Sequence, residues 1–236
     1  MHDNTPPAPS ILLVGASRGL GHAMAGEFAH RGWTVLGTAR SAGGTALHEL
    51  AHQHPDRVLV ETLDVTHADQ IAALRQRLDR RRFDVLFVNA GITHAAPDAT
   101  MAEVDPEAFS RVMLTNAFGP MRTIELLGEL VTERGLIGIM SSGQGSVANN
   151  TLGGRDLYRG SKAALNMFMR SYAARHADSA RALLLLAPGW IRTELGGPDA
   201  PFTLEQTIPD IVDCIVAKRA RPGLEYLDRH GQTVPW

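Results

Sequence analysis

Apolar and polar positions along the chain form two kinds of block. Short runs that are nearly continuous in Val, Ile and Leu are typical of strands that helices cover on both faces of a sheet. Longer stretches between these runs space their apolar residues three or four positions apart, as amphipathic helices do. The predicted strands are residues 11–14, 34–38, 58–63, 85–88, 136–140, 183–187 and 224–227. The predicted helices are residues 20–30, 46–54, 68–81, 106–132, 158–176 and 204–219.

This alternation of strands and helices predicts an α/β fold, a doubly wound parallel sheet of the Rossmann type with about seven strands. We expect residues 10–236 to form a single domain. Residues 1–9 are polar and proline-rich, so we expect a flexible leader there, not a signal peptide. Right-handed crossovers place the loops after the strands along one carboxyl edge of the sheet, where ligands bind.

Composition narrows the classes of function. The chain of 236 residues has a net charge of −2, which offers no basic surface for nucleic acid. No apolar run reaches the roughly 18 residues that a membrane helix needs. The single cysteine, Cys214, excludes an internal disulfide and fits a reducing compartment, so we expect a cytoplasmic protein.

The first loop at the carboxyl edge is rich in glycine and leads directly into a helix. Glycines there allow a tight turn and a close approach of phosphate to the backbone, and the helix N-terminus favours an anion. The same letters match the G-x-S-x-G of a hydrolase elbow, but that elbow needs earlier strands for its oxyanion loop. We therefore predict dinucleotide binding. The expected contacts in this loop are Gly15, Ser17, Arg18, Gly19, Leu20 and Gly21.

The second loop bears on the choice of cofactor. An enzyme that prefers NAD places Asp or Glu after the second strand, to hold the ribose 2′-hydroxyl. The stretch 28–48 contains no acidic residue, and Arg40 follows the strand. Arg40 and Arg18 suit a 2′-phosphate, which guanidinium groups bind through paired hydrogen bonds, so NADP(H) is the expected cofactor. The alternative is two surface arginines in an arginine-rich chain.

Residues 48–52, with His48, Glu49 and His52, match the H-E-x-x-H motif of zinc proteases. They fall on a predicted crossover helix, away from the carboxyl edge, and no third ligand is evident. We expect a solvated helix face and no metal site.

The third and fourth strands end in further candidates. Asp64, followed by Val65, can accept a hydrogen bond from an adenine amino group, although it could equally cap a helix. In the segment Asn89-Ala90-Gly91, Asn89 can brace the central strands, and Gly91 lets a ribose approach the backbone. The alternative for this segment is an ordinary turn.

Only two of the 23 cationic Lys and Arg residues are lysines, Lys162 and Lys218. Lys162 follows Tyr158 by four positions, so the two share one face of the helix that begins there. A nearby ammonium lowers the pKa of a tyrosine from its ordinary value near 10 toward the working pH of an acid–base catalyst. The alternative is a surface pair. We expect Lys218 to be a solvated cation near the end of a helix.

These motifs, with Asn116 and Ser142, occur in the order typical of one family. Over residues 10–236 the chain resembles the short-chain dehydrogenases/reductases. Within that family it is similar to the carbonyl reductases related to sniffer and the C-factor signalling protein, in the segments MSSGQGSVANN, YRGSKAALN, PGWIRTELGG and YLDRHGQTVPW. The matching elements are Gly15-x-x-x-Gly19-x-Gly21, Asp64, Asn89-Ala90-Gly91, Asn116, Ser142, Tyr158-x-x-x-Lys162 and Pro188-Gly189-Trp190-Ile191-Arg192-Thr193.

The resemblance implies NADPH-dependent reduction of a ketone, aldehyde or quinone, or the reverse reaction. In it Tyr158 is the acid–base, Lys162 lowers the tyrosine pKa and holds the nicotinamide ribose, and Ser142 donates to the substrate oxygen. Asn116 positions a water. The implied cofactor contacts also include Tyr158, Lys162, Val65, Ala90, Pro188, Gly189, Ile191 and Thr193.

Two alternatives stay open at this point. Ser142 precedes Tyr158 by 16 residues instead of the family's usual 13 or so, which leaves Ser146 as a second candidate serine. A catalytically quiet NADP-binding sensor or signalling protein is the competing function, and the intact Tyr158 and Lys162 argue against it.

The substrate is expected to be a small carbonyl or alcohol compound, held partly by a loop at about 189–203. No nucleic acid or membrane partner is expected. Pairing of the helices 106–132 and 158–176 across a two-fold axis would give a homodimer or homotetramer. The candidate substrate residues are His94, Gln144, Leu152, Trp190 and Leu195.

Overall fold

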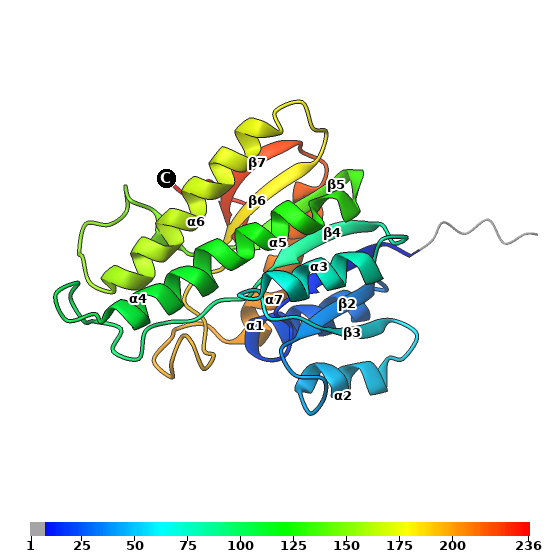
Figure 1. Cartoon of the computed structure of the whole chain (residues 1–236), viewed down its shortest axis with the longest axis horizontal. Helices are drawn as coiled ribbons and strands as arrows, with labels where there is room; N and C mark the ends of the chain where they lie inside the picture. Colours follow the sequence, from blue (N-terminus) through cyan, green and yellow to red (C-terminus); the bar gives the residue numbers. More distant parts are fainter. Residues whose placement is uncertain (1–7) are drawn as a thin grey trace, which may run out of the picture.

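The computed structural model describes residues 8–236, and its strands pair in parallel into one sheet (Figure 1). This confirms the predicted doubly wound α/β fold; the predicted leader lies, up to residue 7, outside the described residues. The strands are β1 (Ser10–Val14), β2 (Thr34–Ala39), β3 (Val58–Thr62), β4 (Phe83–Val88), β5 (Val131–Met140), β6 (Ala182–Ala187) and β7 (Gly223–Asp228). Their spatial order is β3-β2-β1-β4-β5-β6-β7, so the order reverses between β1 and β4.

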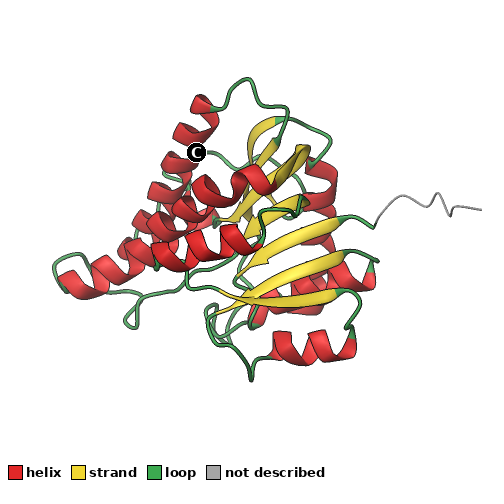
Figure 2. Cartoon of the chain, turned by 45° about the vertical axis from the view of Figure 1, so that its right-hand side comes forward, coloured by secondary structure: helices red, strands yellow, loops and turns green. Residues whose placement is uncertain are grey.

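Helices lie on both sides of this sheet, as the turned view shows (Figure 2). None of the helices in residues 8–236 is long and apolar enough to cross a membrane. The main helices are α1 (Gly19–His30), α2 (Ala46–Gln53), α3 (Ala68–Arg77), α4 (Pro106–Met113), α5 (Gly119–Leu127), α6 (Asp156–Arg175) and α7 (Leu204–Lys218). Short helical turns are η1 (Leu114–Phe118), η2 (Gly128–Leu130) and η3 (Gly143–Gly145).

The apolar strands divide their side chains between two cores. In β1, Ile11 and Leu13 face one way, toward α1, α2 and α7, while Leu12 and Val14 face α3, α5 and α6. Successive side chains of a strand point to opposite faces, so a strand covered on both sides must be apolar at every position. The continuous apolar runs in the sequence have this cause.

The predicted helix 106–132 is not one helix. It is interrupted by the π-helical turn η1, and α5 ends at Leu127, after which β5 begins at Val131. Pro120 has no N–H to donate to the carbonyl of Asn116 four residues earlier, so the α-helical pattern cannot continue there. The widened turn places Asn116, which is fully buried, toward the carboxyl edge of β4.

The prediction that Lys218 is a solvated cation is wrong. Its side chain is fully buried, and its ammonium lies 3.0 Å from a carboxylate oxygen of Glu225 and donates to the carbonyls of Arg221 and Gly223. Burial lowers the pKa of Lys218, and the hydrogen bond and charge of Glu225 only partly oppose this. A buried ammonium needs such partners because it has lost its water.

Candidate active site

The loop between β1 and α1 lies tightly against the ends of β2 and β4. Gly15 has a φ of +83°, and a Cβ there would lie 2.8 Å from the backbone nitrogen of Ala90, so only glycine fits. Asn89 donates from Nδ2 to the carbonyl of Gly15 at 2.9 Å, and the N–H of Gly15 donates to Oγ1 of Thr38 at 3.0 Å. Asn89 therefore ties the end of β4 to the glycine loop that follows β1.

The start of α1 faces the same edge. A Cβ on Gly21 would lie 2.1 Å from the carbonyl oxygen of Gly15, so this helix can approach its strand only with glycine at that position. No side chain caps the first turn of α1, whose N-cap residue is Arg18. The N–H groups there, from the segment that contains Ser17 and Leu20, have the character of an anion-binding site.

Arg18 and Arg40 differ in their surroundings. Arg18 forms an exposed ion pair with Glu194, which lies in the loop after β6. Arg40 is exposed, and its charge helps to lower the pKa of Asp64. Burial raises the Asp64 pKa, but hydrogen bonds from the N–H (2.9 Å) and hydroxyl (2.7 Å) of Thr66 outweigh it, so the net direction is downward. Asp64 thus closes a local turn while it stays ionised.

Lys162 is the buried cation of the site. Its side chain is 3% exposed, and Nζ donates to the carbonyl of Met140, the last residue of β5, at 2.9 Å. Burial lowers its pKa to about 8. A Cβ on Gly91 would lie 3.6 Å from this Nζ and 3.5 Å from Oδ1 of Asn116. The lysine and the asparagine therefore both lie next to Gly91.

Tyr158 lies one helical turn before Lys162, with Nζ 5.9 Å from the centre of its ring. Burial raises its pKa, which a hydrogen bond with Ser142 and the charge of Arg155 only partly oppose. The direction differs from the predicted lowering by Lys162. The reason is desolvation, which destabilises the phenolate more than its neighbours stabilise it. Spacing along a helix does not indicate how buried a side chain is.

Ser142 and Ser146 have different environments. Oγ of Ser142 accepts a hydrogen bond from the N–H of Gln144 at 3.2 Å, which leaves the hydroxyl proton free for Tyr158. Ser146 is buried, and its hydroxyl donates to the carbonyl of Trp236 at 3.4 Å and accepts from the N–H of Asn149 at 3.1 Å. Only Ser142 is in contact with Tyr158.

Asn116 clamps the chain that follows β4. Its Oδ1 accepts from the N–H of Ile92 at 2.8 Å, and its Nδ2 donates to the carbonyl of Ile92 at 2.9 Å and to Oγ of Ser161 at 3.0 Å. The side chain therefore ties the β4 loop to α6 one residue before Lys162. Both N–H groups of its side-chain amide are therefore used within the protein.

The loop after β6 lies over the glycine loop. Gly189 has a φ of +96°, and Ile191 is buried and forms a bridge with Phe202. A Cβ on Gly19 would lie 3.9 Å from Thr193, so Thr193 faces the start of α1. Pro188 lies at the root of this loop, where its carbonyl accepts from Arg229 at 3.3 Å.

The candidate substrate residues are less uniform. Trp190 donates from Nε1 to the carbonyl of Gly196 at 2.7 Å, and Leu195 lies half-exposed in the same loop. Oε1 of Gln144 is buried without a hydrogen-bond partner among the described residues. His94 bonds to the nearby carbonyl of Ala96, and Leu152 is 94% exposed. Among the described residues, the His94 side chain forms no hydrogen bond with the cluster around Lys162.

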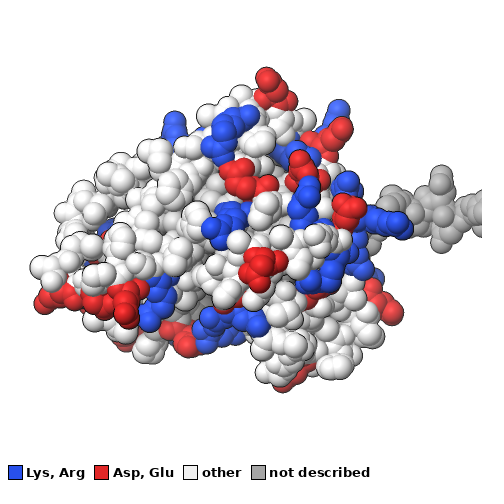
Figure 3. All heavy atoms as spheres, viewed as in Figure 1, with Lys and Arg blue, Asp and Glu red and all other residues white. Residues whose placement is uncertain are grey.

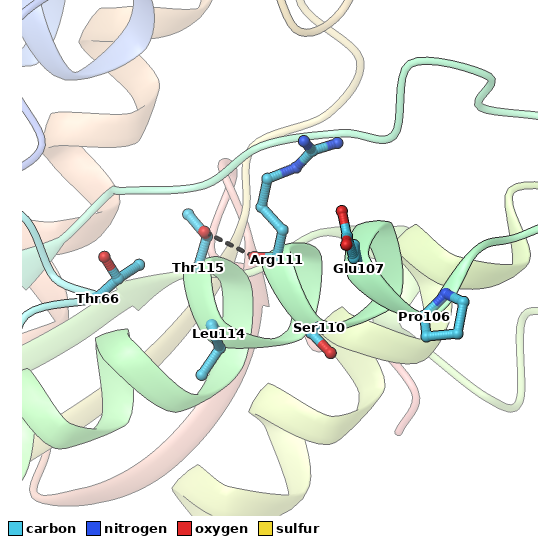
Figure 4. Close-up of a pocket in the computed structure, with 7 residues that line it drawn as sticks. All are labelled: Thr66, Pro106, Glu107, Ser110, Arg111, Leu114 and Thr115. Carbon is cyan, nitrogen blue, oxygen red and sulfur yellow. Dashed lines mark hydrogen bonds between the residues drawn. The ribbon is translucent and has the colours of Figure 1, made fainter.

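A groove of about 520 Å³ lies beside α4 and η1, and Figure 4 draws the side chains that line it, none of which belongs to this cluster. Arg111 extends over it, and the hydroxyl of Thr115 bonds back to the carbonyl of Arg111. The lining residues are Thr66, Pro106, Glu107, Ser110, Arg111, Leu114 and Thr115.

The H-E-x-x-H segment lies on α2, outside the site. His48 is hydrogen-bonded through Nδ1 to the hydroxyl of Thr45 at 2.8 Å. Across residues 8–236, no three His, Cys, Asp or Glu side chains are grouped so that they could hold a metal ion.

Sequence reasoning missed two buried polar residues near the serine, Asn166 and Tyr226. Asn166 could have been found, because it follows Lys162 by four positions and so continues the helical face of Tyr158. Tyr226 has no local signal, since it comes to the site only through the pairing of β7 with β6.

The fold and this cluster define a dinucleotide-binding α/β protein with a Tyr–Lys pair at the carboxyl edge of its sheet. The short chain dehydrogenase family model matches residues 9–201, and the chain belongs to the short-chain dehydrogenase/reductase family of oxidoreductases. Among curated proteins, C-signal of Myxococcus xanthus is 33% identical over 155 residues, which cover 65% of this chain and 92% of that protein.

Solved structures of similar proteins match nearly the whole chain. A Burkholderia multivorans protein assigned to the short-chain dehydrogenases/reductases, solved with bound NADP, is 60% identical with a TM-score of 0.96, over 98% of this chain and 100% of that chain. A carbonyl reductase from Pseudomonas aeruginosa PAO1 in complex with NADP is 35% identical with a TM-score of 0.87, with the same coverage. The carbonyl reductase Sniffer of D. melanogaster is 25% identical, with a TM-score of 0.85 and the same coverage. These likenesses confirm the resemblance to the sniffer and C-factor group.

Proposed function

We propose that this chain is an NADPH-dependent carbonyl reductase that transfers hydride between the nicotinamide and a ketone, aldehyde or quinone, or the corresponding alcohol. The observation that carries the proposal is the convergence of Ser142 and Lys162 on Tyr158 at the carboxyl edge of the sheet. That both the Burkholderia multivorans and the Pseudomonas aeruginosa proteins were solved with NADP supports the choice of cofactor.

The residues of the first two loops fit NADP. Positions 15 and 21 have no room for a Cβ because the glycine loop packs closely on the backbone around it. No side chain caps the first turn of α1, so its N–H groups are left for a pyrophosphate. Arg40 is exposed at the end of β2, where the 2′-phosphate would lie, and no acidic residue competes for it in 28–48. Arg18 has only an exposed ion pair to Glu194 to give up, and such pairs contribute little.

The proposed mechanism assigns one task to each side chain. Bound NADPH supplies the hydride. Ser142 donates a hydrogen bond from its hydroxyl to the substrate oxygen, since its Oγ already accepts from the N–H of Gln144. Tyr158 gives its proton to the same oxygen, and it is protonated at neutral pH.

Lys162 then restores the proton. With a pKa of about 8, its ammonium gives up a proton near neutral pH more readily than an ordinary lysine would. Asn116 keeps the Ile92 backbone and α6 in register around this ammonium. In this proposal Ile191 and Thr193 would hold the nicotinamide carboxamide, a role carried over from the family.

The competing proposal is a catalytically quiet NADP-binding sensor or signalling protein, and the similarity to C-signal is the observation that favours it. Nothing in such a role requires a buried ammonium beside a tyrosine, and burying one is costly. The Tyr158 and Lys162 contacts therefore favour the enzyme. The buried Cys214, whose pKa burial raises to about 11, fits a reducing compartment, and we propose the cytoplasm.

Replacing Tyr158 tests the enzyme proposal. Tyr158→Phe removes the proton donor, so kcat for ketone or quinone reduction should fall at least about 100-fold, measured as NADPH consumption over a substrate panel. Tyr172→Phe is the matched control, because Tyr172 is buried in the same helix α6 without belonging to the cluster, and it should keep its activity. Binding of NADPH without turnover of any substrate by the wild type would favour the sensor instead.

Replacing Arg40 tests the cofactor. Arg40→Asp turns an attraction for the 2′-phosphate into a repulsion, so the Kd for NADPH should rise about 30-fold while the Kd for NADH changes little. Fluorescence titration of the reduced nicotinamide measures both constants. Equal losses for the two cofactors would refute the assignment of the 2′-phosphate.

We also propose that the chain pairs through its α4–α5 and α6 faces. Phe109, Phe118, Met167 and Phe168 are exposed there, and Figure 3 shows that much of this side of the molecule carries no charged residue. Apolar surface of this kind is costly to leave in water.

The measurement for this pairing is the molar mass in solution by light scattering. The wild type should show a multiple of the chain mass, and Phe118→Glu with Phe168→Glu should shift it to one chain. Met101→Glu, at an exposed loop position, is the control and should change nothing. A monomeric wild type would contradict the proposal.

A further inference from the structure

The turn that carries Ser142 is clasped at both ends by one amide side chain. Oγ of Ser141 donates to Oδ1 of Asn166 at 2.6 Å, and Nδ2 of Asn166 donates to the carbonyl of Gly145 at 3.1 Å. Asn166 is 4% exposed and lies on α6, one turn after Lys162. The helix that carries Tyr158 and Lys162 therefore also holds the serine turn through the Asn166 side chain.

A second contact reaches the same turn from β7. The hydroxyl of Tyr226 donates to the backbone carbonyl of Ser142 itself. Tyr226 is 1% exposed, and its ring packs at 5.5 Å from that of Trp236. The carbonyl of Trp236 in turn accepts from the N–H of Ala148 at 2.9 Å, so the C-terminal segment, which lies beside α6 in Figure 1, fastens the far side of the loop.

We propose that Tyr226 and Asn166 are positioning residues of this site, which act through Ser142 by fixing its hydroxyl against Tyr158. The proposal rests on the proposed function, in which Ser142 donates to the substrate oxygen. Neither residue touches that oxygen or the cofactor in this account. Each sets the orientation of a group that does.

The physical argument starts from the backbone of Ser142. It is extended (φ −162°, ψ 147°), and it lies between β5 and the single turn η3. A turn this short does not fix its own rotation, so the direction of the Ser142 hydroxyl depends on what holds its carbonyl and its two neighbours. Tyr226 holds the carbonyl, and Asn166 holds Ser141 and Gly145. Since a misplacement of about 1 Å can cost about 100-fold in rate, these contacts have a catalytic consequence.

Tyr226→Phe is the test, because it removes one hydroxyl and keeps the ring that packs on Trp236. We expect kcat for carbonyl reduction to fall about ten-fold, a factor equal to about 1.4 kcal/mol, while KM for NADPH stays within about two-fold. In a Ser142→Ala background the same change should cause no further loss, since the group it orients is gone. A residue that merely stabilises the fold would not show this split or this dependence.

Controls separate the proposal from a general loss of structure and from failure of the proposed function. Tyr172→Phe, at a buried tyrosine away from the serine turn, should leave kcat unchanged, and both tyrosine variants should be compared by thermal unfolding. If Tyr226→Phe does not fold, Asn166→Ala is the second variant. It should lower kcat by the same factor in the wild-type background and cause no further loss in the Ser142→Ala background.

The results that overturn the proposal are specific. Unchanged kcat in Tyr226→Phe, or an equal loss with and without Ser142, removes Tyr226 from the positioning role. If Ser142→Ala and Tyr158→Phe both leave reduction intact, the proposed function itself fails and the positioning role fails with it. If Ser142→Ala lowers kcat and Tyr226→Phe does not, only the positioning proposal fails.

Discussion

The structure around the site depends on one buried ammonium, that of Lys162. A charge taken out of water must find other partners or lose its proton, and here it does some of each: it donates to the carbonyl of Met140, and its pKa falls to about 8. The contact requires β5 to end where α6 passes over it. Gly91 lies beside this ammonium, since a Cβ there would be in van der Waals contact with it at 3.6 Å. Asn116 completes the enclosure from the π-helical turn.

Much of the fold could be predicted from the sequence because its rules are local. A strand covered on both faces must be apolar at each position, a covered helix must repeat its apolar residues, and the alternation of the two leaves few topologies. The interruption at Asn116 was missed, although its cause, Pro120, stands in the sequence. Periodicity reports which residues are buried, and the apolar pattern continues through the π-turn without a break.

The site divides in the same way. Gly15, Gly21 and Asn89 could be predicted because a phosphate-binding turn after the first strand has steric needs that few residues meet. Three other features depend on tertiary contacts that no spacing encodes. Lys218 forms an ion pair with Glu225 on the strand that follows it. Tyr226 donates a hydrogen bond to the Ser142 carbonyl, and burial raises the pKa of Tyr158.

The most direct measurement follows from the rarity of lysine in this chain. With only Lys162 and Lys218 present, a protein labelled with ¹³C at lysine Cε should give two titrating resonances, and the Lys162→Arg variant assigns them. Lys162 should be an ammonium below a pKa of about 8 and a neutral amine above it. A Lys162 resonance that titrates near 10.4, the ordinary value for lysine, would contradict the account, because the ammonium would then be solvated and not enclosed beside Tyr158.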